Sequence, residues 1–238
     1  MRPQVFGKEH VIYFLISTLV AVACFILTKK YAKTEKSQRL VIKAVAFGLF
    51  LSILANRLSQ VFRYDTVRWY CIIPDSFCGM TSLVLSLGVL FGKKNNDVLH
   101  FAWLLGIFGG IATVVYPDFV GQSDSIFYLP TISGLLHHSF SAFTVVLLLA
   151  FGQIEITYKK WRCVFFGLTA YMTVGAFLIG VFKVSDAFHI FDPLLSNTPL
   201  TAWFMAPLYA LGHGLIFLGV KIVKKRKGLK NASEVLDK

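Results

Sequence analysis

The stretch Leu129–Phe151, LPTISGLLHHSFSAFTVVLLLAF, decides how this sequence has to fold. It is long and apolar enough to cross a bilayer as a helix, which takes about 20 residues. Near its start it carries two adjacent histidines, His137 and His138, and ionisable side chains inside a membrane span are costly and point to function. On a helix, Ser133, His137 and Ser141 share one stripe. We interpret this stripe as part of a polar site, the alternative being close packing of small residues against another helix.

The composition around this stretch is that of a membrane protein. Hydrophobic residues make up 56% of the 238 residues, and charged residues make up 15%, against about a quarter in soluble domains. The net charge of +12 lies in short blocks of Lys and Arg between apolar runs. Such blocks are typical of anchors beside membrane spans. We therefore expect a multi-pass protein of the cell membrane with membrane lipid as its partner and no nucleic-acid partner, and the oligomeric state stays open.

Apolar runs predict an all-α bundle with seven transmembrane helices. The predicted spans are residues 10–28, 40–62, 77–91, 98–116, 129–151, 161–182 and 201–223. The third span is short for a hydrocarbon core of about 30 Å. Residues 1–223 are expected to form a single transmembrane domain, and residues 224–238 a basic cytoplasmic tail that anchors the topology.

Basic residues alternate between the connections and so predict the orientation. Of the 24 Lys and Arg residues, 18 lie in the connections after the first, third and fifth spans, after the last span, or within four residues of these boundaries. Because Lys and Arg accumulate in cytoplasmic loops, the N-terminus is predicted to lie outside and the C-terminus inside.

Several polar residues then fall in the outer half of the bilayer. Asn56 and Arg57 lie near the outer end of the second span, Asp75 and Cys78 at the start of the third, and Asp118 after the fourth. A single outward-facing polar cavity would accommodate them together with the two histidines. Arg57 is expected either to reach the outer headgroups or to pair with Asp75 or Asp118.

Short motifs resemble the YwaF family of bacterial seven-span membrane proteins over most of the chain. The motifs are Phe6-Gly7-Lys8-Glu9-His10, Ile73-Pro74-Asp75-Ser76-Phe77-Cys78, Tyr116-Pro117-Asp118, His138-Ser139, and Pro199 with Trp203. Two positions depart from the family pattern, because Ser76 and Gly79 stand where the family usually has His and Asp.

The resemblance implies a lipid-handling enzyme, since the YwaF family is related to an animal acyltransferase that remodels ether phospholipids through a cysteine and a histidine. Cys78 and His138 are the matching positions for nucleophile and base, with His137 as the alternative base. In such chemistry a thiolate attacks an acyl ester and an imidazole moves the proton. Asp118 or Asp75 would orient the imidazole, as the third member of a triad does.

The resemblance also implies a substrate, a phospholipid or related acyl ester, and no metal or cofactor is expected. Arg57 would bind the lipid phosphate, with Asn56 and Asp75 as further substrate-binding residues.

Other readings of the same residues stay open. The alternative is that the cavity belongs to a transporter or to a solute- or lipid-binding subunit without a covalent step. A metal or haem site would need ligands from a second helix, with His10 or His213 as candidates, since adjacent histidines diverge on a helix. A disulfide between Cys71 and Cys78 would remove the proposed nucleophile.

Overall fold

The computed structural model describes residues 6–63, 66–117, 125–195 and 197–236, and it is helical throughout, without a strand in these ranges. Its helices are α1 (Lys8–Tyr31), α2 (Glu35–Val61), α3 (Phe77–Leu90), α4 (Asp97–Val115), α5 (Leu129–Ala150), α6 (Trp161–Phe182) and α7 (Ala202–Leu236). Two short 3-10 turns, η1 (Trp69–Ile72) and η3 (Tyr158–Lys160), precede α3 and α6.

Six of the seven helices are long and apolar enough to cross a membrane, which confirms the predicted all-α transmembrane bundle. The exception is α3, whose 14 residues extend for about 21 Å at about 1.5 Å per residue. α3 is well buried among its neighbours. A short helix is tolerated in such surroundings, because its ends face protein and not lipid.

Local sequence explains where the helices begin and end. Thr34 and Ser37 form a reciprocal capping box at the start of α2, while Ser76 and Asn96 accept backbone N–H groups at the starts of α3 and α4. Side-chain oxygens at these positions satisfy N–H groups that have no partner inside the helix. α6 ends on Lys183, whose backbone is left-handed (φ 56°, ψ 34°).

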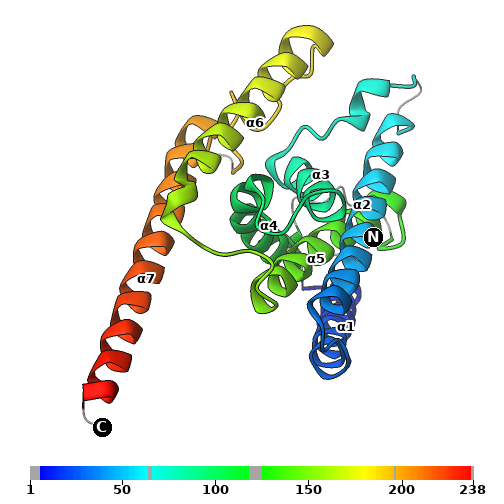
Figure 1. Cartoon of the computed structure of the whole chain (residues 1–238). Coiled ribbons are helices and arrows are strands. Elements are labelled where there is room, and N and C mark those ends of the chain that lie inside the picture. Colours follow the sequence, from blue (N-terminus) through cyan, green and yellow to red (C-terminus); the bar gives the residue numbers. More distant parts are fainter. Residues whose placement is uncertain (1–5, 64–65, 118–124, 196, 237–238) are drawn as a thin grey trace.

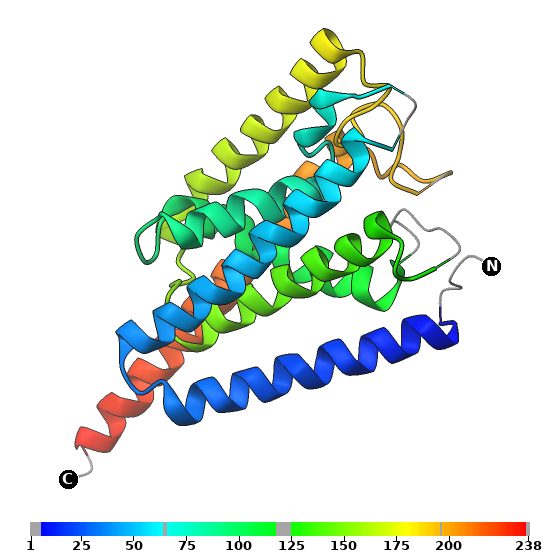
Figure 2. The same cartoon turned by 90° about the vertical axis from the view of Figure 1, so that its right-hand side faces the viewer.

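α5 lies at the centre of the bundle and packs most extensively against α2 and α4, with α3 against α2 and α4 (Figure 1). α6 and α7 lie on one side of this core and α1 on the other (Figures 1 and 2). α1 begins and α7 ends at opposite ends of the bundle (Figure 2). We call the end at which α1 begins and α6 ends the outer end, since the charge pattern predicts that it faces outside.

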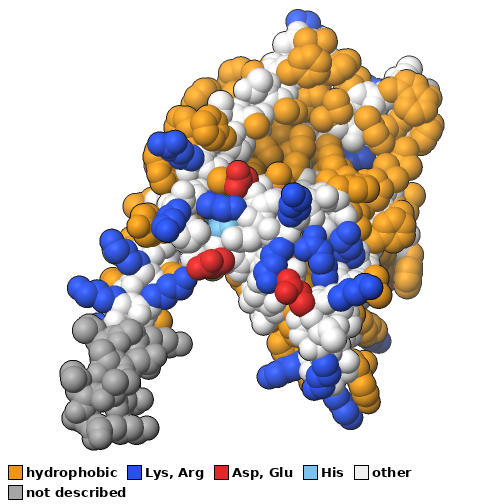
Figure 3. Space-filling model, in the orientation of Figure 1, with side chains coloured by type: hydrophobic (Ala, Val, Ile, Leu, Met, Phe, Trp, Pro, Cys, Tyr) orange, Lys and Arg blue, Asp and Glu red, His pale blue; other side chains and the backbone are white. Residues whose placement is uncertain are grey.

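The inner end is held by ion pairs between the connections. Lys94 pairs with Glu35, Lys160 with Asp97, and Lys224 with Glu155, at 2.9, 3.0 and 2.7 Å. In the view of Figure 1, Figure 3 shows Lys and Arg side chains gathered around acidic ones in the lower part of the molecule, with hydrophobic side chains covering the upper part. This separation is the one expected of a protein whose apolar half lies in lipid.

Candidate functional site

Cys78 is the second residue of α3 and lies at the outer end of the bundle. The chain reaches it through an extended segment at Ile73, and Ser76 starts the helix by accepting the N–H of Gly79 at 3.2 Å. Its thiol faces Gly109 of α4 so closely that a Cβ at position 109 would lie 2.9 Å from Sγ. Only glycine leaves room for the sulfur at this crossing.

His138 of α5 reaches the same glycine from the other side. Its ring donates a hydrogen bond to the carbonyl of Gly109, and a Cβ on the neighbouring Gly110 would meet the carbonyl oxygen of His138 at 2.6 Å. The backbones of α4 and α5 therefore cross in close contact here. Cys78 and His138 lie on either side of one residue, Gly109, although no hydrogen bond joins their side chains in the described structure.

The bond to Gly109 has a chemical consequence for His138. When one imidazole nitrogen carries the proton and donates it to a fixed acceptor, the other nitrogen is left as the acceptor. Such a neutral, oriented ring is suited to act as a base. The backbone carbonyl of Gly109 thus orients this ring, and the orienting role expected of Asp118 or Asp75 stays a prediction.

His137 points to a different partner. Its Nδ1 lies 3.1 Å from Oγ of Ser82 on α3, and its ring centroid lies 4.1 Å from that of His138. All three side chains are buried. Ser82 and Cys78 are four residues apart and so share one face of α3.

Asn56 connects α2 to the start of α5. Its amide donates to the carbonyl of Pro130 at 3.1 Å and to Ser133 Oγ at 3.3 Å, while the hydroxyl of Ser133 donates to the carbonyl of Leu129. Asn56 therefore satisfies backbone and side-chain groups of α5, the helix that carries the histidines.

Arg57 and Asp75 form an ion pair at 2.7 Å, one of the alternatives that the sequence left open. The Arg57 side chain is only 12% exposed, and Asp75 is 47% exposed. The backbone carbonyl of Asp75 also accepts the N–H of Phe188 at 2.7 Å. This pair joins α2, the entry to α3 and the outer connection after α6.

Three further residues were predicted as site candidates: Asp118, His10 and His213. Asp118 falls outside the described residues. His10 is buried and bonds the carbonyl of Val114 at 2.8 Å, whereas His213 packs against Trp103 with ring centroids 5.6 Å apart. Neither is placed to join His137 and His138.

Cys71 and Cys78 are both free thiols in the structure. Cys71 lies in η1, outside the membrane spans, where burial and then the nearby carboxylate of Asp75 raise the pKa of its thiol.

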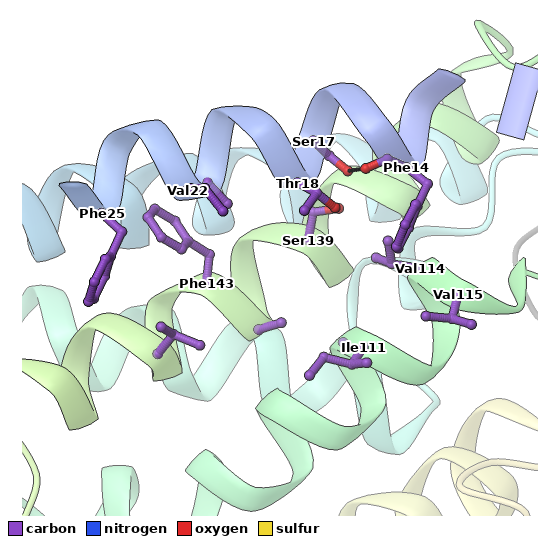
Figure 4. Close-up of a pocket in the computed structure, with 14 residues that line it drawn as sticks. Phe14, Ser17, Thr18, Val22, Phe25, Ile111, Val114, Val115, Ser139 and Phe143 are labelled. Atoms are coloured by element: carbon purple, nitrogen blue, oxygen red, sulfur yellow. Dashed lines mark hydrogen bonds between the residues drawn. The ribbon is translucent and has the colours of Figure 1, made fainter. Parts of the chain in front are cut away.

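Two apolar grooves separate α1 from the rest of the bundle. One, of about 430 Å³, lies between α1, α4 and α5 (Figure 4); the other, of about 540 Å³, lies between α1, α2 and α5. Ser139, the residue after His138, lines both, and its hydroxyl lies 2.8 Å from that of Tyr13. Gly110 also lines the first groove, so that groove ends at the backbone beside His138.

Sequence reasoning missed two residues of this site. Ser82 had a usable signal, because it follows Cys78 by one helical turn. Gly109 had a weaker one, since a glycine pair within an apolar span indicates close helix packing but does not identify the side chains that meet there.

A family model described as the TMEM164 family matches residues 5–223 of the chain. No curated protein and no solved structure matches the chain. The match agrees with the predicted membrane protein, whereas the relation to the YwaF family and to an acyltransferase stays a prediction.

Proposed function

Because the chain belongs to the TMEM164 family, a family of transmembrane proteins, we propose that it is a lipid acyltransferase or acyl-ester hydrolase of the cell membrane, with Cys78 as nucleophile and His138 as base. One observation carries the proposal: Cys78 and His138, from α3 and α5, both contact Gly109 of α4. The contact between Ser82 and His137 and the apolar grooves beside α1 support it.

The proposed reaction begins with proton transfer from the Cys78 thiol to the free nitrogen of His138. The sulfur attacks the ester carbonyl of a phospholipid, a C–S bond forms, and the ester C–O bond breaks. The leaving alcohol takes the proton from His138. The resulting thioester is then attacked by a second lipid hydroxyl, which completes acyl transfer, or by water, which completes hydrolysis. No cofactor is required for either outcome.

In the described structure no hydrogen bond joins the side chains of Cys78 and His138, which is compatible with this scheme. Hydrogen bonds between catalytic groups are often long without substrate and tighten only when it binds. His137 and Ser82 support the base by filling the space behind His138. The apolar grooves beside α1 suit acyl chains, because at this depth the only solvent is hydrocarbon.

The proposal is tested on purified protein in nanodiscs that contain a phosphatidylcholine with an isotope-labelled acyl chain and an unlabelled lysophospholipid acceptor. Mass spectrometry follows labelled product, and intact-protein mass follows acyl addition. Cys78→Ala should abolish both, and His138→Ala should lower turnover by about 10²-fold or more. Cys163→Ala is the matched control, a thiol removed from the inner end of α6.

A second function is favoured by the grooves themselves. Two long apolar grooves on either side of α1 suit a subunit that binds lipid, or a transporter, without any covalent step. This reading requires the parent protein to bind lipid without forming labelled product or an acyl adduct on Cys78. In that case the enzyme proposal fails.

A further inference from the structure

Tyr171 of α6 reaches α3 beside the proposed nucleophile. Its ring centroid lies 6.1 Å from that of Phe77, and its hydroxyl lies 3.1 Å from Oγ1 of Thr81. Phe77 and Thr81 stand before and after Cys78 on the same helix, so Tyr171 lies along the turn of α3 that carries the thiol. The side chains of Tyr171 and Cys78 are close enough to interact electrostatically.

The order of side chains around α3 puts Cys78 between two different partners. With 3.6 residues per turn, Thr81 lies about 60° to one side of Cys78 and Ser82 about 40° to the other. Thr81 faces Tyr171 of α6, whereas Ser82 faces His137 of α5. The thiol therefore has the histidine helix on one side and the hydroxyl of Tyr171 on the other.

The two hydroxyls of Thr81 and Tyr171 hold one hydrogen more than their contact uses. Each hydroxyl has one O–H to donate, and the bond between them takes only one of the two. Within the described part of the chain, neither side chain makes a further hydrogen bond. Thr81 is 1% exposed and Tyr171 is 4% exposed, so bulk water does not accept the second hydrogen. When Thr81 donates, the O–H of Tyr171 is left free beside the thiol.

Acyl transfer to a thiol requires a donor of this kind. As the sulfur attacks an ester carbonyl, the π electrons of the C=O bond move onto the oxygen, and a fixed donor aimed at that oxyanion stabilises the transition state. The base takes a proton from the sulfur, whereas the donor contacts the carbonyl oxygen. The two groups thus have to reach different atoms around the nucleophile, which the two sides of Cys78 allow.

We propose that Tyr171 donates a hydrogen bond to the oxyanion that forms when Cys78 attacks the lipid ester, and that Thr81 positions it. This inference rests on the proposed function. Tyr171 keeps its proton throughout: the C–S bond forms, the carbonyl oxygen takes the negative charge and accepts the O–H, and the C=O bond then reforms. The ester C–O bond breaks in that step, and the leaving alcohol takes the proton from His138.

The first test is turnover of the labelled phosphatidylcholine in nanodiscs, with kcat and KM measured separately. Tyr171→Phe keeps the aromatic ring and removes only the hydroxyl. It should lower kcat by about 10²–10³-fold, the loss that removal of one oxyanion donor causes, and leave KM near the parental value, because the interaction is made only in the transition state.

Thr81 should act through Tyr171. Thr81→Val keeps the shape of the side chain without its hydroxyl and should lower kcat by up to about tenfold, the effect of one ordinary hydrogen bond. Thr81→Ser, which retains the hydroxyl, should restore the parental kcat. Equal kcat in the valine and serine variants would exclude the positioning role.

A second measurement separates oxyanion binding from folding. A trifluoromethyl ketone analogue of the lipid adds a thiol reversibly and carries a negative oxygen in the adduct, whereas an ether analogue does not react. Tyr171→Phe should weaken binding of the ketone by about 10²-fold and leave binding of the ether unchanged. A structural role for the hydroxyl would weaken both equally.

Tyr209→Phe is the matched control. Tyr209 of α7 packs on the same ring as Tyr171, that of Phe101, with centroids 6.0 and 4.8 Å away, and its hydroxyl donates to the backbone carbonyl of Phe101. This variant removes a hydroxyl from the same aromatic cluster but not from the side of the thiol, so kcat should stay at the parental value. An equal loss of kcat in Tyr209→Phe and Tyr171→Phe would overturn the inference, and so would a parental kcat in Tyr171→Phe.

Failure of the enzyme proposal gives a different result. If the parent makes no product, or if Cys78→Ala turns over lipid like the parent, the thiol mechanism and the role of Tyr171 fall together. If Cys78→Ala is inactive while Tyr171→Phe retains the parental kcat, the thiol mechanism stands and only the assignment of the oxyanion donor is wrong.

Discussion

The hydroxyl of Ser82 lies 3.1 Å from Nδ1 of His137, and both side chains are buried between α3 and α5. This contact fixes a ring that in turn lies 4.1 Å from the ring of His138. Ser82 is therefore a positioning residue in the proposed site, two contacts away from the proposed base, His138.

Ser82→Ala is expected to destabilise the protein by about 1–3 kcal/mol, because it leaves a buried imidazole nitrogen without a partner. The acyl adduct on Cys78 should still form, more slowly. Thermal unfolding and intact-protein mass measure the two effects, and Ser82→Thr, which keeps the hydroxyl, should restore the rate. Loss of the adduct in Ser82→Ala with an unchanged rate in Cys78→Ala would instead make Ser82 the nucleophile.

The ion pair between Arg57 and Asp75 at the outer end predicts that removing either partner lowers stability by a different amount. Asp75→Ala leaves the mostly buried guanidinium of Arg57 unpaired and should lower the free energy of unfolding by about 1–3 kcal/mol. Arg57→Leu should cost less, because Asp75 is 47% exposed and water can replace its partner. Denaturation of both single variants and the double variant measures this. Equal costs for the two single changes would contradict the burial difference.

The sequence was sufficient for the helices but not for the contacts of the site. Pro74 and Ser76 correctly placed the start of α3 at Phe77, and apolar runs placed the other helices within a few residues. The last helix runs past the predicted end at residue 223 to Leu236, because Lys and Arg are good helix formers and do not stop a helix.

Contacts between helices depend on rotation about each helix axis, which a single sequence leaves undetermined. His137 and His138 were singled out correctly as buried polar residues, but their separate partners, Ser82 and Gly109, depend on how α3, α4 and α5 turn toward one another. The predicted role of Arg57 as a phosphate ligand remains untested, although its pairing with Asp75 places its charge inside the fold.

The inner end should respond to acid through Glu155, which lies between α5 and η3. The ammonium of Lys224 on α7 lowers the pKa of this carboxyl below its usual value of 4.5. A lowered folded pKa means that the pair stabilises the fold fully above about pH 4.5, and that this contribution is lost as the pH falls through the folded value. Thermal unfolding of the parent and of Lys224→Gln should converge at low pH and also at high salt, which screens exposed pairs. A constant difference between the two at all pH values would exclude this linkage.

The orientation of the bundle is a prediction from charge alone. Ser123→Cys should react with a membrane-impermeant thiol reagent added to intact cells, and Ser233→Cys should react only after lysis. The parent protein supplies the background from its own cysteines. Labelling of Ser233→Cys in intact cells, with Ser123→Cys protected, would reverse the assignment of outer and inner ends.

Gly109 offers the sharpest test of the proposed site, because Cys78 and His138 both contact it. Gly109→Ala introduces a methyl group 2.9 Å from Sγ of Cys78, closer than van der Waals contact allows, so the thiol must rotate away from α4. Turnover and acyl addition at Cys78 should fall by about 10²-fold, the loss that misplacement by about 1 Å can cause. Gly180→Ala is the matched control, since a Cβ at Gly180 on α6 meets no atom within 4 Å; it should leave turnover unchanged. In a helix interior alanine is otherwise favoured over glycine by about 1 kcal/mol, so both variants should fold. Equal turnover in the two variants would mean that the contact of Cys78 and His138 with Gly109 has no part in the chemistry.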